Sequence, residues 1–282
     1  MENLFSGLEE FGLDNLSKMK IYSDDESENK KKSGVKKEKP FNEADFIFDK
    51  TYTCPVCDQE FKSKTVKTGK VKLESADTDL RPKYHLLDSL KYDAIVCPKC
   101  GYSALNRFFS YMTSPQAKLI KKQISNNFKG ISEDGDIITY DEAIAKHKLA
   151  LVNTIVKKGK ISERAYTCLK LAWLYRGKSE SLPADTKNYD EVKKELAKEE
   201  LEFINKAYEG FTSAFSKELF PMCGMDEVTT TYLIADLARR CGKYDEASRW
   251  VSRVLISKEA NERIKSKARN IKELIQEQKE KN

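Results

Sequence analysis

Four cysteines form two short motifs of the same type, and this pattern is typical of a site that binds one metal ion. The first motif is C-P-V-C at residues 54–57, and the second is C-P-K-C at residues 97–100, followed directly by Gly101. Each C-P-x-C turn places two sulfur atoms on one side of a tight loop, and two such turns supply four thiolates in a tetrahedral arrangement. Glycine at position 101 accepts a positive φ, so the amides can turn back toward the sulfur atoms. The spacing predicts a structural Zn²⁺ ion with four ligands, namely Cys54, Cys57, Cys97 and Cys100.

A disulfide pair or a redox C-x-x-C motif is the alternative interpretation of these cysteines. It is disfavoured because both motifs share one form, no secretory signal precedes them, and no strand–helix pattern of the thioredoxin type surrounds them. The same four ligands would also accept iron. The other cysteines stand singly within apolar helical patterns and are interpreted as buried hydrophobic residues: Cys168, Cys223 and Cys241.

The segment between the two motifs is longer than a simple zinc ribbon needs. It contains 39 residues, where simple ribbons use roughly 15 to 20, so we expect an inserted hairpin or excursion. Apolar residues alternate with lysines from 61 to 73 in a strand-like manner, broken by a turn at 68–69, and residues 92–96 read as a strand that leads into the second motif. His85 is a possible but unneeded ligand, because four cysteines already complete the metal coordination.

Composition and charge exclude several classes of protein. The chain has 282 residues, of which 39% are hydrophobic and 34% charged, so it can form a core beneath a solvated, helix-rich surface. Acidic residues within the first 20 positions argue against a signal peptide, and no apolar run reaches the ~18 residues that a membrane span needs. We therefore expect a cytoplasmic protein without membrane contact. The net charge of +6 permits a nucleic-acid partner without arguing for one.

Residues 1–45 are predicted to be an N-terminal tail and a disordered linker. Charged and small polar residues make up almost all of 21–40, and such a segment buries too little apolar surface to offset its ordering entropy. Before it, apolar residues between 4 and 19 suggest a short amphipathic segment. This segment is either a docking motif for a partner, a frayed helix on the protein's own surface, or not ordered at all.

Residues 113–282 are predicted to form helical repeats of the tetratricopeptide type. The sequence Y-D-E-A occurs at 140–143 and again at 244–247, each time at the start of an amphipathic helix. A weaker helix is expected over 115–127, capped by Ser114. A middle repeat is interrupted after Gly177 by an insertion of roughly 25 residues, which extends its second helix backward to residue 189.

A last helix over 261–280 is expected to cap the open end of the repeats. Within them, three side chains are interpreted first as core or groove residues: His147, Trp173 and Trp250. The predicted fold class is therefore mainly α with a small β metal module at 46–112, a zinc ribbon followed by a helical repeat domain.

The order of these motifs resembles a family of uncharacterised bacterial proteins known as domain of unknown function 2225, over about Phe48 to Ile256. The resemblance rests on both cysteine motifs, the D-T-D sequence at 77–79, and L-A-W-L-Y-R at 171–176, together with Pro82, Tyr84, Tyr92, Asp93 and Tyr102. It implies a bacterial cytosolic protein with cysteine metal ligands, helical repeats and no assigned activity. The N-terminal linker has no counterpart in the resemblance.

No catalytic constellation is visible, so the leading hypothesis is a non-enzymatic scaffold or adaptor that binds a protein or peptide in the repeat groove. The alternative is nucleic-acid binding through the ribbon, because residues 50–107 hold eleven Lys and Arg against seven Asp and Glu. Phe61, Tyr84 and Tyr102 would then stack on bases or merely pack. A third hypothesis is an enzyme that uses the Asp77–Tyr84 loop, for which turn capping is the simpler interpretation. The oligomeric state stays open.

The metal is expected to supply most of the folding free energy of the ribbon. Replacement of one cysteine ligand should then unfold residues 52–110, while the helices from Ser114 onward keep their structure.

Overall fold

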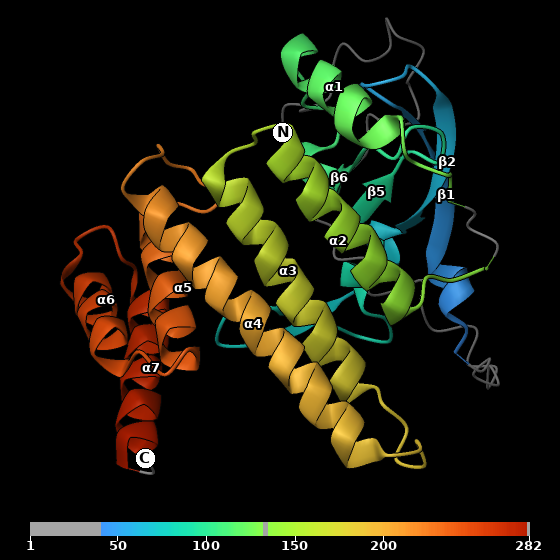
Figure 1. The fold of residues 1–282 in the computed structure, drawn as a ribbon. Coiled ribbons are helices and arrows are strands. Elements are labelled where there is room, and N and C mark those ends of the chain that lie inside the picture. The colour runs from blue at the N-terminus through green and yellow to red at the C-terminus, as the bar shows by residue number, and fades with distance from the viewer. Residues whose placement is uncertain (1–40, 132–134, 281–282) are drawn as a thin grey trace, which may run out of the picture. The chain divides into compact units, whose positions relative to one another are not determined.

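The computed structural model describes residues 41–131 and 135–280, and from Asn42 onward the described residues form one compact unit. Helices dominate this unit, and its small sheets all precede residue 106 (Figure 1). The predicted class, mainly α with a small β module, is therefore confirmed. The expected disordered linker at 21–40 and the apolar segment at 4–19 lie outside the described residues.

Three antiparallel strand pairs form the β module. Strand β1 (Ile47–Thr53) pairs with β2 (Glu60–Val66), with Thr53 opposite Glu60, so the first cysteine motif lies in the turn between them. Strand β5 (Ala94–Val96) pairs with β6 (Ser103–Leu105) around the second motif. Strand β3 (Leu73–Ala76) pairs with β4 (Pro82–Tyr84). This third pair is the expected hairpin within the long segment between the motifs.

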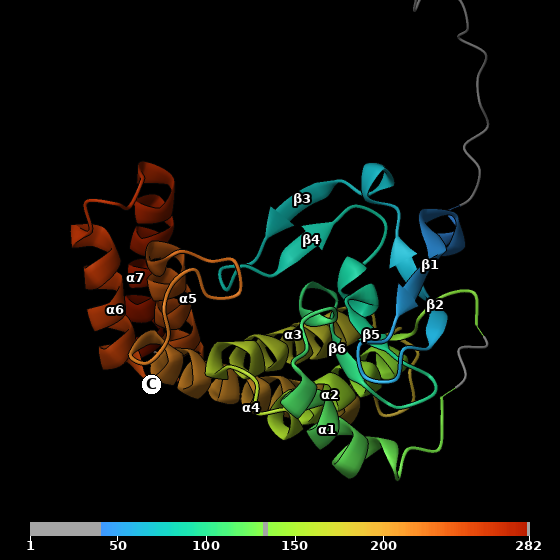
Figure 2. The same cartoon turned by 90° about the horizontal axis from the view of Figure 1, so that it is seen from above.

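Seven α-helices follow in the described part of the chain. They are α1 (Ser114–Ile120), which continues as a π-helical turn (Lys121–Ser125), α2 (Tyr140–Val156), α3 (Ile161–Glu180), α4 (Tyr189–Phe215), α5 (Glu227–Arg240), α6 (Tyr244–Ile256) and α7 (Glu262–Glu280). Each helix from α2 to α7 packs against the next one along the chain (Figures 1 and 2). No described helix is both long and apolar enough to cross a membrane.

The helix starts follow local sequence signals. Both Y-D-E-A sequences begin helices, α2 and α6, as predicted. Thr139 caps α2 in a capping box with Glu142. The cap of α1 is Thr113 rather than the predicted Ser114, with Pro115 in the first turn. Helix α4 has 27 residues, so the predicted backward extension of this helix is confirmed.

Two clusters of buried apolar residues hold the unit together. The larger one joins α2 to α7 and also includes Ile47, Leu90 and Tyr92 of the β module. The smaller one surrounds the cysteines and includes Ile120 of α1 and Ile124 of the π-helical turn. Both clusters therefore contain residues from each side of the expected domain boundary at residue 112. Because Ile120 of α1 is part of the cysteine cluster, the helices from Ser114 onward do not all have a core separate from the β module.

Candidate metal centre

The two cysteine motifs adopt the same backbone geometry. In the first, the amide of Asp58 donates to the carbonyl oxygen of Cys54 at 2.9 Å, and in the second, the amide of Gly101 donates to that of Cys97 at 3.0 Å. Asp58 and Gly101 both have positive φ, 59° and 71°. The left-handed residue predicted at Gly101 is thus present in both motifs, since Asp tolerates this conformation better than most residues with a side chain.

The four cysteine sulfur atoms converge on one point between the motifs. All four lie within 4.8 Å of one another. The Sγ atoms of Cys54 and Cys100 are 3.5 Å apart, and those of Cys57 and Cys97 are 3.7 Å apart. A disulfide bond would need about 2.05 Å. Four thiolates at about 2.3 Å from a central ion lie about 3.8 Å apart, so these spacings suit a tetrahedral metal site.

Burial and proton sharing also suit a cation at this point. The side chains of Cys54 and Cys97 have no exposed surface, and Cys100 is 5% exposed. Hydrogen bonds from the Cys100 and Cys54 thiols hold the pKa of the Cys97 thiol far below its usual range, whereas the bond with Cys100 raises the pKa of Cys54. A cation that replaces the shared protons would leave thiolates, which are the metal-binding form of cysteine.

Aromatic rings pack around the centre. Phe109 contacts Tyr52, Phe61 and Tyr102 with ring centroids 5.7, 5.9 and 5.0 Å away, and the Tyr102 hydroxyl donates to the Phe109 carbonyl at 3.0 Å. Phe61 is 9% exposed and Tyr102 is fully buried. The sequence left open whether Phe61 and Tyr102 stack on bases or pack within the protein. In the structure both rings pack within the protein, so neither is available to stack on a base.

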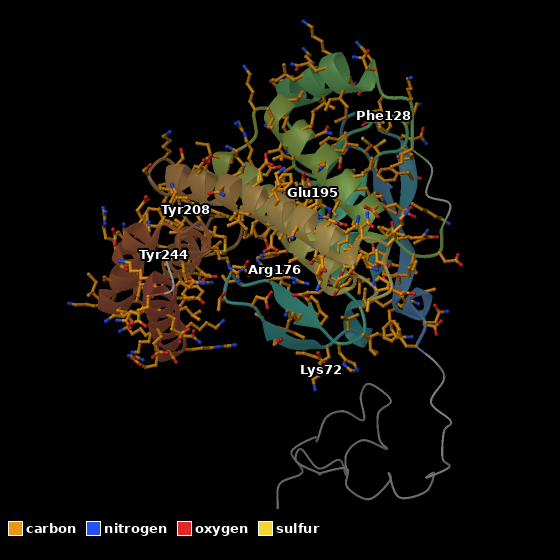
Figure 3. The ribbon with its side chains drawn as sticks, turned by 60° about the horizontal axis from the view of Figure 1, so that its bottom comes forward. Lys72, Phe128, Arg176, Glu195, Tyr208 and Tyr244 are labelled. Atoms are coloured by element: carbon orange, nitrogen blue, oxygen red, sulfur yellow. The ribbon has the colours of Figure 1, made fainter. Side chains whose placement is uncertain are left out.

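Helix α2 and the segment after the π-helical turn hold the second motif. Asn153 of α2 donates through Nδ2 to the carbonyl oxygen of Gly101 at 3.1 Å, and the Ser103 hydroxyl donates to the carbonyl of Lys146 at 3.3 Å. A Cβ atom on residue 101 would lie 2.6 Å from the ring of Phe128, which is marked in Figure 3. Position 101 therefore requires glycine both for its φ and for this close approach.

His85 and the three remaining cysteines lie outside the sulfur group. His85 is exposed, and its Nδ1 atom lies 2.5 Å from a carboxylate oxygen of Glu74 on β3. Cys168 is buried, as expected, whereas Cys223 and Cys241 are only partly buried. Burial raises the pKa of the Cys223 thiol to about 12 and that of Cys241 to about 11. In the part of the chain that the structure describes, the metal-binding group consists of four thiols, without histidine or carboxylate.

The D-T-D sequence at the tip of the β3–β4 hairpin forms an ion-pair network with α3. Asp79 is fully buried, and its carboxylate accepts two hydrogen bonds from the Arg176 guanidinium, at 3.1 and 2.6 Å. Arg176 also donates to Asp77 at 2.9 Å and to Glu200 of α4 at 2.8 Å. Figure 3 shows Arg176 on the side of α3 that faces the hairpin. Burial raises the pKa of Asp79, but the bonds from Arg176 outweigh it and leave the pKa below its usual value.

The same loop is also bound to α5 (Figure 2). The carbonyl oxygen of Thr78 accepts a hydrogen bond from the Tyr232 hydroxyl at 2.8 Å, and its Oγ1 accepts one from Arg240 at 3.0 Å. The turn-capping contact expected of Asp79, from the amide of Arg81, is long at 3.5 Å. The loop therefore attaches the hairpin to two helices, α3 and α5.

A second buried ion pair joins the β module to α3, and the sequence reasoning missed it. Lys170 lies 3.1 Å from a carboxylate oxygen of Asp93 and contacts the rings of Tyr166 and Trp173, at 5.2 and 5.3 Å from their centroids. His147 nearby is fully buried, as predicted, and burial lowers its pKa to about 4. Asp93 is one of the residues on which the family resemblance rests, but no local sequence signal identified Lys170 as its ion-pair partner.

Comparison with known proteins gives one family match. Residues 47–280 match the family model described as "Uncharacterized protein conserved in bacteria (DUF2225)". No curated protein and no solved structure matches the chain.

Proposed function

The chain belongs to the DUF2225 family of proteins conserved in bacteria, and on this premise we propose that it is a non-enzymatic adaptor. In this proposal, a structural zinc ion fixes the β module to a helical body, and the helical body binds a protein or peptide partner. The observation that carries the proposal is the closed group of four cysteine sulfurs. Four thiolates complete a tetrahedral coordination and leave no position for water or substrate.

The identity of the ion follows from ligand chemistry. Thiolate ligands favour zinc or iron over the harder cations such as magnesium and calcium. Zinc has no redox chemistry and therefore suits a purely structural site. Its role here would be to hold Cys54 and Cys57 against Cys97 and Cys100. None of the seven cysteines forms a disulfide bond, which suits the reducing cytoplasm that we propose as the location. We expect protein purified without added metal to contain about one zinc per chain by inductively coupled plasma mass spectrometry. Iron as the main metal, or less than about half an ion per chain, would contradict the proposal.

A groove between α4 and α6 supports the adaptor role. Its volume is about 340 Å³, and it is lined by Thr212, Glu246, Arg249, Trp250 and Arg253. The Trp250 ring contacts Phe215 edge-on at 5.2 Å, and the Arg253 guanidinium lies 4.5 Å from the centroid of the Phe215 ring. Tryptophan and arginine are the residue types that most often dominate the binding energy of protein interfaces. A prearranged Trp–Arg groove is therefore a suitable place for a peptide segment.

Partner capture with matched variants tests the adaptor role. The intact protein is used to capture partners from an extract of the bacterium that encodes it, and Trp250→Ala and Arg249→Glu are compared with Leu201→Ala, which changes an exposed apolar residue of α4 outside the groove. We expect the wild type and Leu201→Ala to retain the same protein in stoichiometric amount, and both groove variants to lose it. Circular dichroism checks that the variants remain helical. Absence of any stoichiometric partner, or equal capture by all four proteins, would contradict the adaptor role.

A further inference from the structure

The segment from Ala94 to Ile131 contains no acidic residue. It includes the second cysteine motif, α1 and the π-helical turn. Its six basic residues are all exposed, and none forms an ion pair with another described residue, in contrast to the paired Lys157, Lys170 and Arg176. They are Lys99, Arg107, Lys118, Lys121, Lys122 and Lys129. This segment therefore carries six positive charges that form no ion pair with a described acidic side chain.

A second basic segment meets the first at one cavity. The turn between α2 and α3 has the sequence K-K-G-K at 157–160, and Lys158 and Lys160 are exposed. The lining of a cavity of about 590 Å³ includes residues of both segments, namely Arg107, Phe108 and Tyr111 together with Lys157 and Lys160. In Figure 1 the end of α2 and the start of α3 lie on the same side of the ribbon as α1. Gln116 of α1 also lines the cavity, so the cavity lies beside this helix. We refer to the cavity and the exposed lysines of α1 and the π-helical turn together as the basic face.

The two acidic residues that line this cavity are already engaged. Glu163 lies 2.7 Å from the Lys157 ammonium. Glu218 accepts hydrogen bonds from the amide of Ile161 at 2.6 Å and from the Ser162 hydroxyl at 2.5 Å, so it occupies the N-terminus of α3. Neither Arg107 nor Lys160 forms an ion pair with a described acidic residue, and the Arg107 guanidinium donates a hydrogen bond to the Cys223 carbonyl. The cavity therefore attracts an anionic ligand.

Aromatic groups at this cavity narrow the class of ligand. The Tyr111 side chain is 75% exposed at its rim, which is unusual for so large a ring. Phe108 lies beneath the Arg107 guanidinium, 5.4 Å from its ring centroid. Proteins bind single-stranded nucleic acid with exposed aromatic rings that lie beside several Lys and Arg side chains. The bases stack on the rings, and the phosphates contact the positively charged side chains.

We propose that this basic face binds single-stranded nucleic acid. A base stacks on Tyr111 at the mouth of the cavity, and the phosphates on either side contact Arg107, Lys160 and the lysines of α1 and the π-helical turn. A duplex would not use Tyr111, because its bases are already stacked and paired. The site goes beyond the proposed adaptor role, which rests on the groove between α4 and α6.

Fluorescence anisotropy with the full-length, metal-loaded protein and a labelled oligothymidylate of about 20 nucleotides tests the proposal. We expect affinity to fall steeply between about 50 and 200 mM salt. Tyr111→Ala should weaken binding about 5- to 150-fold. Lys121→Gln with Lys122→Gln should lower the slope of log affinity against log salt by about 1.4. The matched control replaces Lys194 and Lys198, two exposed lysines of α4, with glutamine and should bind as the wild type does.

Three outcomes would overturn the proposal. The first is absence of binding at about 100 mM salt, and the second is unchanged affinity in the Tyr111 and lysine variants. The third is equal affinity for a duplex of the same length, or equal competition by polyglutamate, either of which indicates a general polyanion surface. Trp250→Ala should bind the oligonucleotide normally, so failure of this proposal and failure of the adaptor proposal are distinguishable. All substituted side chains on this face are exposed, and circular dichroism confirms that each variant is folded.

Discussion

Loss of one cysteine ligand should unfold the metal module and α1 together. In Cys97→Ser the site keeps three thiolates, and a structural zinc ion contributes on the order of 10 kcal/mol or more to folding. This exceeds what a small β module can supply without it. Ile120 and Ile124 are buried in the cysteine cluster, and each would lose roughly 1.5 to 3 kcal/mol of burial when the cluster opens. A seven-residue helix is not stable in water without such packing.

Hydrogen exchange measured by mass spectrometry resolves this effect along the chain. In Cys97→Ser we expect residues 52–66, 94–109 and 114–125 to exchange as unfolded chain, while α4 to α7 stay protected by the larger core. Cys241→Ser serves as the control, because Cys241 lies outside the sulfur group. This control should keep about one metal ion per chain and the wild-type exchange pattern.

Two results would refute the reasoning. Wild-type protection of 94–109 in metal-free Cys97→Ser would show that the module folds without the ion. Unfolding of the strands with full protection of α1 would show that Ile120 and Ile124 are held by other contacts.

Three further perturbations have defined outcomes. Asp79→Asn should lower the free energy of unfolding by about 3 to 5 kcal/mol, measured by urea denaturation, because it leaves part of the buried Arg176 charge uncompensated; a loss below about 1 kcal/mol would contradict this. Because His147 has a pKa of about 4 when folded and about 6.5 when unfolded, the unfolded state binds more protons between these values. Acidification from pH 7 to pH 5 should therefore cost the wild type about 2 kcal/mol more than His147→Gln, and equal losses would exclude the effect. Gly101→Ala should weaken zinc binding in a chelator competition assay, since the new Cβ would clash with Phe128, and unchanged affinity would show that this ring moves away freely.

The structural features that could be predicted from the sequence are those that local sequence signals determine. The cysteine motifs each fix two ligands locally, so the group of four could be read from spacing. The length of α4 and the start of α7 follow from periodicity and turn signals. The tetratricopeptide assignment stays a prediction, although each helix from α2 to α7 does pack against the next.

Contacts between distant residues could not be predicted in this way. Asp79 and Arg176 are 97 positions apart, and both lay in recognised motifs, but neither motif identifies the other as its partner. Strands β1 and β6 were missed, and so was β4, whose residues were expected to belong to the Asp77–Tyr84 loop. These strands are short or largely polar, and pairing with a partner strand defines them more than their composition does. Whether the rings of Phe61 and Tyr102 are exposed or buried could not be predicted for the same reason. Both rings are buried because they pack against Phe109, which is distant from Phe61 in the sequence.

A metal ion at the cysteine site would also cross-link the chain on either side of the β3–β4 hairpin. The chain leaves the cysteine site at Cys57 and returns to it at Cys97, so a bound ion would close these residues into a ring without a covalent bond. For a loop of this length, the chain-entropy relation for cross-links gives a stabilisation of about 4 kcal/mol, which disappears when the ion leaves. The ring is tied a second time where Asp79 meets Arg176. After a single proteolytic cut between Cys57 and Cys97, a bound ion would therefore still connect the two parts of the chain, and chelation would remove this connection.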